Sequence, residues 1–312
     1  MDIDNGDIIN FLEMIYPENE SILIGCRSES CSSYECCEYD IIVLGLKSKE
    51  NNNKNRIKKT IFHKIGNKTL EILFLNQEGF FQSKEVNYLN YMNLSNFVFK
   101  SNLENYFEKR KHYNQKNFNI LTKRRSLQFA LVCTKINKQI IEHTFDNNLS
   151  TFYIKMMSFN VLEILIQLFS GENPKPSHLK YQMNAIRENN HKIKESVDII
   201  SEYLELERSN ISTITRSEKS LIFLLNLNKC NQQEIDLFLT KLNYFKKKTM
   251  YVDANLLIHS FIKKQHFDRD FIKNYSKLLS FILDIQIKDK TILLKEFEIL
   301  FNINKNFIKN NY

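Results

Sequence analysis

Three acidic side chains occur where the sequence predicts β-strands, and their spacing suits the binding of divalent cations. Glu38 and Asp40 lie two residues apart at the start of an apolar segment that runs to Leu46. Side chains two residues apart in a strand point to the same face of a sheet. Both carboxylates can therefore converge on one hard cation or on a close pair of cations. A solvated strand end is the alternative interpretation.

Glu71 is the third acid, and it lies inside a second apolar segment, residues 70–75. A carboxylate in such a strand is costly unless it is paired, bound to a ligand or facing a solvent cleft. If the two strands are neighbours, Glu71 can join Glu38 and Asp40. Three carboxylates near one point repel each other, and Mg²⁺ or Mn²⁺ would relieve this repulsion. An outward-facing position on an edge strand is the alternative for Glu71.

The segment Gly25-Cys26-Arg27-Ser28 follows the first predicted strand, residues 21–25, and is expected to open a helix. Gly25 permits a close approach of the backbone, and the exposed N–H groups at the start of a helix suit a phosphate group. Arg27 could add positive charge at this point. An ordinary surface arginine is the alternative.

These segments resemble the nucleotidyltransferase superfamily, which includes DNA polymerase beta, kanamycin nucleotidyltransferase and the minimal nucleotidyltransferases. The family pattern is a strand followed by Gly-Ser, about a dozen residues, Asp-x-Asp on the next strand and a third acid on a later strand. The matching residues here, all within residues 1–100, are Ile24-Gly25-Cys26, Glu38-Tyr39-Asp40 and Leu70-Glu71-Ile72. The chain departs from the pattern in having Cys26 for Ser and Glu38 and Glu71 for Asp. It also lacks the second Gly of the helix-start loop.

The resemblance implies an α+β fold: a nucleotidyltransferase-type mixed sheet with flanking helices, followed by a large all-α domain. It also implies that a nucleoside monophosphate is transferred from an NTP to a hydroxyl acceptor by two-metal phosphoryl transfer. Glu38 and Asp40 would bind Mg²⁺ (or Mn²⁺) and hold the triphosphate. Glu71 would bind the second metal or act as base on the acceptor hydroxyl. The nucleotide-binding residues that the resemblance implies are Gly25, Cys26, Arg27 and Ser28.

The pattern leaves the acceptor open, and a small molecule, a protein side chain and an RNA end are all compatible with it. The substitutions at Cys26, Glu38 and Glu71 favour a second hypothesis, a catalytically degenerate protein that binds a nucleotide or a partner on the same fold. A third hypothesis is an RNA-binding helical module, which needs a contiguous basic face over residues 109–125.

Two patterns in the second half of the chain could also carry function. His178 and Lys180 are candidate contacts to the acceptor or the nucleotide, because residues 174–180 are similar to a segment in the helical halves of some superfamily relatives. Arg187 and His191 are similar to the Arg-x-His signature of HEPN-type ribonucleases, and one helix would place both on one face. A polar pair on the helix surface is the alternative.

The composition excludes several classes of protein. Of 312 residues, 6 are Gly and 3 are Pro, so a Gly-rich Rossmann sheet or propeller is disfavoured and long helices are favoured. The net charge of +8 suits a polyanionic ligand. Residues 1–20 lack the basic stretch of a secretory signal, and the six cysteines are not expected to form a disulfide framework. We therefore expect a cytoplasmic protein with free thiols and no membrane partner; its oligomeric state is left open.

The apolar pattern divides the chain into two predicted domains, residues 1–102 and 103–312. In the first, a helix capped by Asp4 precedes strands at 21–25, 39–46, 60–65 and 70–75, with a hairpin turn at Gly66-Asn67 and an edge strand at 95–100. In the second, the predicted helices are 103–118, 122–145, 150–170, 176–207, 215–226, 230–246, 253–264, 267–284 and 291–309. The apolar segment 152–169 contains polar residues such as Lys155 and is expected to be a buried core helix.

Overall fold

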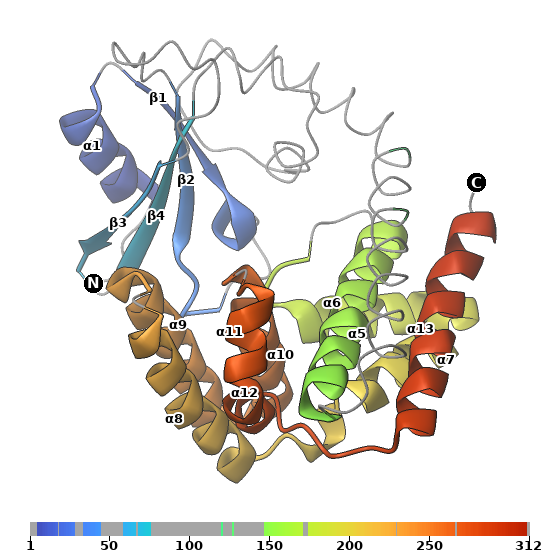
Figure 1. The fold of residues 1–312 in the computed structure, drawn as a ribbon. Coiled ribbons are helices and arrows are strands. Elements are labelled where there is room, and N and C mark those ends of the chain that lie inside the picture. Colours follow the sequence, from blue (N-terminus) through green and yellow to red (C-terminus); the bar gives the residue numbers. More distant parts are fainter. Residues whose placement is uncertain are drawn as a thin grey trace, which may run out of the picture. The chain divides into compact units, whose positions relative to one another are not determined.

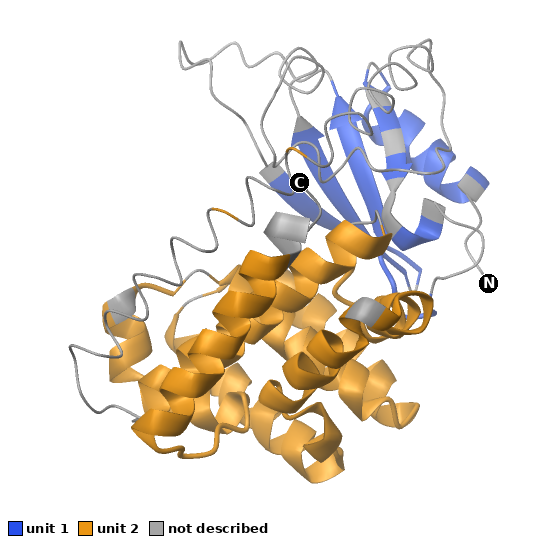
Figure 2. Cartoon of the chain, turned by 90° about the vertical axis from the view of Figure 1, so that its right-hand side faces the viewer, with its two compact units in different colours: residues 1–118 blue, residues 119–312 orange. Residues whose placement is uncertain are grey.

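The computed structural model describes residues 5–17, 19–28, 34–44, 59–66, 68–75, 120, 127, 147–170, 174–228, 230–265 and 267–310. The chain divides into two compact units, residues 1–118 and residues 119–312 (Figure 2). In the described residues the first unit holds a mixed sheet and the second is helical, which confirms the predicted α+β composition. The predicted domain boundary at residues 102 and 103, the strand at 95–100 and the helices at 103–118 and 122–145 lie outside the described residues, apart from residue 127.

Four strands form the sheet of the first unit, in the order β1-β2-β4-β3 (Figure 1). β1 runs antiparallel to β2, β2 runs parallel to β4, and β4 runs antiparallel to β3. The strands are β1 (Glu20–Ile24), β2 (Tyr39–Leu44), β3 (Lys59–Ile65) and β4 (Lys68–Leu75). All four match predicted strands within one or two residues at each end, because short apolar runs rich in Ile and Leu mark them in the sequence.

A tight turn at Gly66 joins β3 and β4, as the Gly66-Asn67 pair predicts. Gly66 has a φ of 57°, a left-handed conformation that glycine adopts without a clash from a Cβ atom. The pairing of the two strands extends to Ile65 opposite Lys68. The turn is therefore as short as predicted, and β4 begins two residues earlier than its apolar run.

The two faces of the sheet carry different side chains. On one face, alternate residues of the strands pack against Ile8 and Leu12 of α1 (Asn5–Ile15), and this core contains Leu23, Tyr39, Ile41, Val43, Leu70, Ile72 and Phe74. Asp40 and Glu71 alternate with these core positions in β2 and β4. Because strand side chains point alternately to the two faces, both carboxylates lie on the face opposite α1.

The described part of the second unit is built around α5 (Asn147–Ser170), which contacts α6, α7, α10, α12 and α13 (Figure 1). The remaining elements are α6 (Leu179–Asn189), α7 (His191–Tyr203), η2 (Leu206–Arg208), α8 (Ile211–Leu227), α9 (Gln232–Lys247), α10 (Tyr251–Lys264), α11 (Arg269–Asn274), α12 (Ser276–Ile282) and α13 (Lys290–Asn310). Most of these helices match predicted ones within a few residues.

Two predicted helices are wrong in their continuity. The helix predicted over 176–207 is interrupted at Asn190, which has extended backbone angles between α6 and α7. Asparagine favours such breaks because its side chain competes with the helical hydrogen bonds of the backbone. The helix predicted over 267–284 is likewise divided at Tyr275, between α11 and α12.

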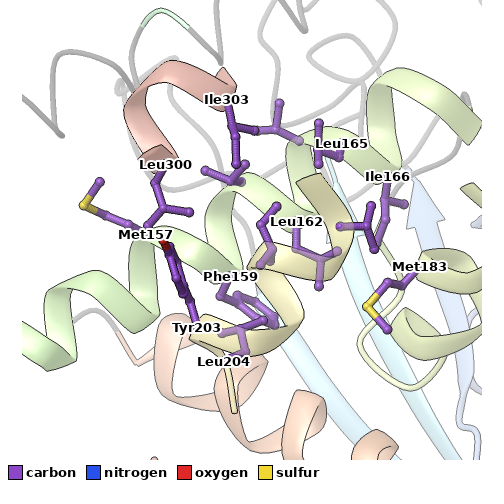
Figure 3. Close-up of a cluster of buried hydrophobic side chains, with 14 of the residues drawn as sticks. Met157, Phe159, Leu162, Leu165, Ile166, Met183, Tyr203, Leu204, Leu300 and Ile303 are labelled. Carbon is purple, nitrogen blue, oxygen red and sulfur yellow. The ribbon is translucent and has the colours of Figure 1, made fainter. Parts of the chain in front are cut away.

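Figure 3 shows the core that α5 forms with its neighbours. Side chains of α5 meet Met183 of α6, Tyr203 and Leu204 at the end of α7, and Leu300 and Ile303 of α13. The α5 side chains labelled there are Met157, Phe159, Leu162, Leu165 and Ile166. This packing confirms the predicted core helix. Among the described residues α5 alone is long and apolar enough to cross a membrane, but 67% of that stretch is buried, so it is weak evidence for a span.

A buried lysine ties α5 to the ends of two other helices. Lys155 is 1% exposed, and its Nζ donates to a carboxylate oxygen of Glu205 at 2.6 Å and to the carbonyl oxygens of Leu283 at 2.7 Å and Asp284 at 3.3 Å. Burial lowers the pKa of Lys155, and the charge of Glu205 opposes this effect. Glu205 and Asp284 have φ values of 54° and 49°. These left-handed residues follow the ends of α7 and α12 by two positions, where the lysine binds. The ion pair offsets part of the cost of burying the charge of the lysine.

His259 is another buried basic side chain of the second unit. It is wholly buried in α10, its ring stacks on Phe159 with centroids 5.9 Å apart, and its Nδ1 lies 2.9 Å from the carbonyl oxygen of Asn255. Burial lowers the pKa of His259 to about 3, and the positive charge of Lys155 acts in the same direction. The ring is therefore neutral in the folded protein at pH values where it takes up a proton in the unfolded chain.

Acidification should destabilise the second unit through His259. Between about pH 6.5 and pH 3 the unfolded chain binds one more proton at this residue than the folded chain. The free energy of unfolding should therefore fall with decreasing pH, by up to about 1.4 kcal/mol per pH unit. Urea unfolding measured from about pH 7 to about pH 5 tests this. His259→Asn should remove this part of the slope, whereas His191→Gln, at an exposed histidine, should keep it. Equal slopes in His259→Asn and wild type would contradict the assignment.

Candidate metal site on the β-sheet

The register of the sheet brings the acids predicted to act together into one row. Asp40 of β2 lies directly opposite Glu71 of β4, and Ile24 of β1 lies opposite Asp40 on the other side. Residues directly opposite each other in neighbouring strands share a face of the sheet. Glu38 precedes β2 by one residue and is two residues from Asp40, so it continues the same face.

The three carboxylates converge. One carboxylate oxygen each of Glu38, Asp40 and Glu71 lies within 4.8 Å of the other two, and all three residues are half-buried. Ligand oxygens on opposite sides of one Mg²⁺ are about 4.2 Å apart, so small rotations of these side chains suffice to bind one ion. Two ions about 4 Å apart are equally compatible with three carboxylates. The donor set, oxygen atoms from three acids, fits Mg²⁺ or Mn²⁺.

The glycine turn lies beside this row. Gly25 follows Ile24, the residue of β1 that pairs with Asp40, and begins the short 3₁₀ helix η1 (Gly25–Ser28). The predicted opening of a helix at Gly25 thus takes the form of a single 3₁₀ turn in the described residues. The turn starts one residue beyond the end of β1, on the strand adjacent to Asp40. The pairing of β1 with β2 therefore places the backbone of Gly25 close to Asp40.

Arg27 in this turn makes contacts that its predicted phosphate role does not include. Its guanidinium donates to the carbonyl oxygens of Tyr34 at 3.0 Å, Glu35 at 3.2 Å and Cys37 at 3.2 and 3.3 Å. It also lies over the ring of Tyr39, with its central carbon 5.1 Å from the ring centroid. In this structure Arg27 binds the segment that leads into Glu38, and a phosphate contact from its side chain stays a prediction.

Cys26 is buried against a second thiol. Cys26 and Cys37 are both free and buried. The hydrogen bond with the side chain of Cys37, together with burial, raises the pKa of Cys26 well above its ordinary value, and the negative charges of Asp40 and Glu38 act in the same direction. Cys26 is therefore protonated at neutral pH and packs as a small apolar side chain. Its predicted contact with a phosphate is untested.

His178 and Lys180 lie in the second unit, at the start of α6. His178 is buried, and the Nζ atom of Lys180 is 3.6 Å from a carboxylate oxygen of Asp253 in α10. Asp253 was not predicted as a candidate residue. Burial raises the pKa of its carboxyl group, and Lys180 counteracts this shift. An acid between the apolar residues Val252 and Ala254 was the signal in the sequence that could have identified it. The predicted contacts of His178 and Lys180 to an acceptor or nucleotide stay predictions.

The helix break separates Arg187 from His191. Arg187 lies in the last turn of α6 and pairs with Asp198 of α7 at 2.8 Å, whereas His191 begins α7 after Asn190. The expectation that one helix places both on one face is wrong. The basic face proposed over residues 109–125 lies outside the described residues, apart from residue 120.

The acid cluster, Glu38, Asp40 and Glu71, should bind Mn²⁺ with Asp40 as one of the ligands. In Asp40→Asn the amide keeps the size of the side chain but removes a charged ligand, so we expect the affinity for Mn²⁺ to fall at least about tenfold. Titration of the protein with Mn²⁺, followed by electron paramagnetic resonance of the free ion, measures this. Asp7→Asn in α1 removes an exposed acid of the same unit and should leave the affinity unchanged. Equal affinities in the two variants would show that Mn²⁺ binds elsewhere.

No protein-family model matches the chain, and no curated protein matches it in sequence. The acids at positions 38, 40 and 71 and the turn at Gly25 are the part of the described structure with the most specific chemistry.

Proposed function

We propose that the protein is a Mg²⁺-dependent nucleotidyltransferase of the superfamily that its N-terminal sequence resembles. It would transfer a nucleoside monophosphate from an NTP to a hydroxyl acceptor. The observation that carries the proposal is the convergence of Glu38, Asp40 and Glu71 within 4.8 Å of one another on one face of the sheet. Three carboxylate oxygens at this distance can be ligands of one divalent cation, whose charge would offset their mutual repulsion.

The order of the strands supports the same proposal. The resemblance implies a glycine turn after one strand, two acids on the next and a third acid on a later strand. In the sheet, these strands are adjacent: β1 precedes the turn at Gly25, β2 carries Asp40 and β4 carries Glu71. Because α1 packs on the opposite face, this helix does not cover the acids, which are half-buried.

The chemistry assigns each acid a task. Glu38 and Asp40 would hold Mg²⁺ together with the triphosphate of the NTP, and Glu71 would hold a second ion or accept the proton of the attacking hydroxyl. Bound Mg²⁺ would supply charge neutralisation for the triphosphate and for the pyrophosphate that leaves. The acceptor oxygen forms a bond to the α-phosphorus while the bond from the α-phosphorus to the bridging oxygen breaks.

The glycine turn contributes less side-chain chemistry than the resemblance implies. Cys26 is packed against Cys37, and Arg27 donates to carbonyl oxygens of the chain. Contacts from this turn to the β- and γ-phosphates would then come from backbone N–H groups of Gly25–Ser28. The acceptor can be a small molecule, a protein side chain or an RNA end.

This use of Cys26 and Arg27 favours one competing function. In this structure the side chains of Cys26 and Arg27 are engaged within the protein and not with a phosphate. Such a protein could bind a nucleotide or a partner without catalysing a reaction. On that hypothesis the acids bind a divalent cation for structure or ligand binding, and no bond is broken.

Labelled nucleotides distinguish the two functions. Each protein variant is incubated with a labelled NTP, Mg²⁺ or Mn²⁺ and a cell extract. An active nucleotidyltransferase should transfer a label on the α-phosphate and should not transfer one on the γ-phosphate. Asp40→Asn and Glu71→Gln should reduce transfer at least about a hundredfold, since both remove a charge at the reacting centre. Asp7→Asn should transfer as the wild type does.

The control outcomes separate the hypotheses. Transfer of the γ-label alone would contradict nucleotidyl transfer and point to phosphoryl transfer. Mn²⁺-dependent NTP binding by the wild type without transfer of either label, for all four NTPs, would support the degenerate binding protein. Equal transfer by Asp40→Asn and wild type would remove the acid cluster from the reaction.

A further inference from the structure

The strongest unexplained feature of the first unit is the way Arg27 binds backbone instead of a ligand. A single guanidinium donates to three carbonyl oxygens, those of Tyr34, Glu35 and Cys37, over 3.0–3.3 Å. The turn is also closed by a hydrogen bond from the amide of Cys37 to the carbonyl oxygen of Tyr34 at 3.0 Å. These bonds make residues 34–37 a short loop whose carbonyl groups point at one side chain.

The last of these carbonyl groups is directly connected to the acid cluster. The carbonyl of Cys37 belongs to the peptide group that joins Cys37 to Glu38, and it receives both the Nε and an Nη donor of Arg27. Peptide groups are planar, so holding this oxygen also restricts the orientation of the peptide plane that leads to the Cα atom of Glu38. Arg27 therefore holds the backbone at the first of the three acids.

A second contact reaches the residue between the two acids of β2. The guanidinium lies over the ring of Tyr39, which is buried in the core formed with α1. Arginine is favoured over lysine in such a contact, because its flat guanidinium can lie against the ring. Arg27 thus connects the turn after β1, the peptide before Glu38 and the anchored ring between Glu38 and Asp40.

From these contacts we infer that Arg27 is a positioning residue of the metal site: it orients Glu38 toward the point where Asp40 and Glu71 converge. This inference rests on the metal site of the proposed function but not on the transfer reaction. Arg27 itself carries no ligand for the cation. Its N–H donors fix the backbone conformation at the start of β2. This restricts Glu38 to conformations in which its carboxylate lies near those of Asp40 and Glu71.

Charge and geometry predict opposite effects of removing this arginine. A cation near a metal site repels the metal ion, so loss of its charge alone should strengthen the binding of Mn²⁺. Loss of positioning should weaken it. Lys68 provides the matched control, because its Nζ donates to the carbonyl oxygen of Glu35 at 3.3 Å and does not bind the peptide group of Glu38. Lys68→Met should therefore leave the Mn²⁺ affinity equal to that of wild type or raise it.

The experiment measures the affinity for Mn²⁺ of the full chain, with no nucleotide present. We expect Arg27→Ala to bind Mn²⁺ at least about tenfold more weakly than wild type. Arg27→Lys, which keeps the charge but cannot fork between the carbonyl groups, should be weakened as well. Ethylguanidinium added to Arg27→Ala should restore binding, and ethylammonium, with the same charge, should not. Rescue also shows that the variant is folded, and circular dichroism before each titration checks this independently.

The outcomes distinguish this inference from the proposed function. Unchanged or tighter Mn²⁺ binding in folded Arg27→Ala, while Asp40→Asn has lost it, would overturn the positioning role and leave the metal site intact. Full binding by Arg27→Lys, or equal rescue by ethylammonium, would overturn it, because the forked donors of arginine would then not be needed. Failure of the wild type to bind Mn²⁺ would overturn it together with the metal site.

Discussion

The convergence of three carboxylates on one face of a small sheet is the constraint on which the first unit depends. Glu38, Asp40 and Glu71 stand within 4.8 Å of one another because β2 and β4 are parallel and Asp40 lies opposite Glu71. A slip of one residue between these strands would turn one acid to the face that packs on α1. On the proposed function, a divalent cation bound by these acids would offset their repulsion.

The rest of the first unit makes this register hold. The apolar residues that alternate with Asp40 and Glu71 bury themselves against α1, which fixes the face on which the acids are left. The neighbouring strand β1 ends beside Asp40. Arg27, in the turn after β1, donates a hydrogen bond to the peptide group that precedes Glu38. The apolar residues packed on α1 and the contacts of Arg27 thus hold the strands and the turn around the acids.

The sequence predicted the local features well and the non-local ones only through the resemblance. Short apolar runs identified all four strands, and Gly66 identified the hairpin between β3 and β4. The adjacency of β2 and β4 joins residues about thirty positions apart, which no local pattern encodes. The contacts of Arg27 with carbonyl groups were not predictable, because backbone acceptors have no signature in a sequence. The break at Asn190 was missed because a polar residue inside an amphipathic pattern suits a helix surface and a helix end equally well.

A crystal structure of the protein with Mn²⁺ and an NTP analogue that resists cleavage between the α- and β-phosphates would test the central claim most directly. Anomalous scattering at the manganese absorption edge locates the ions without reference to any assumed site. The account predicts at least one manganese peak about 2.2 Å from carboxylate oxygens of Asp40 and of Glu38 or Glu71, with triphosphate oxygens completing its coordination. Manganese bound elsewhere, with the three acids turned away from one another, would contradict it.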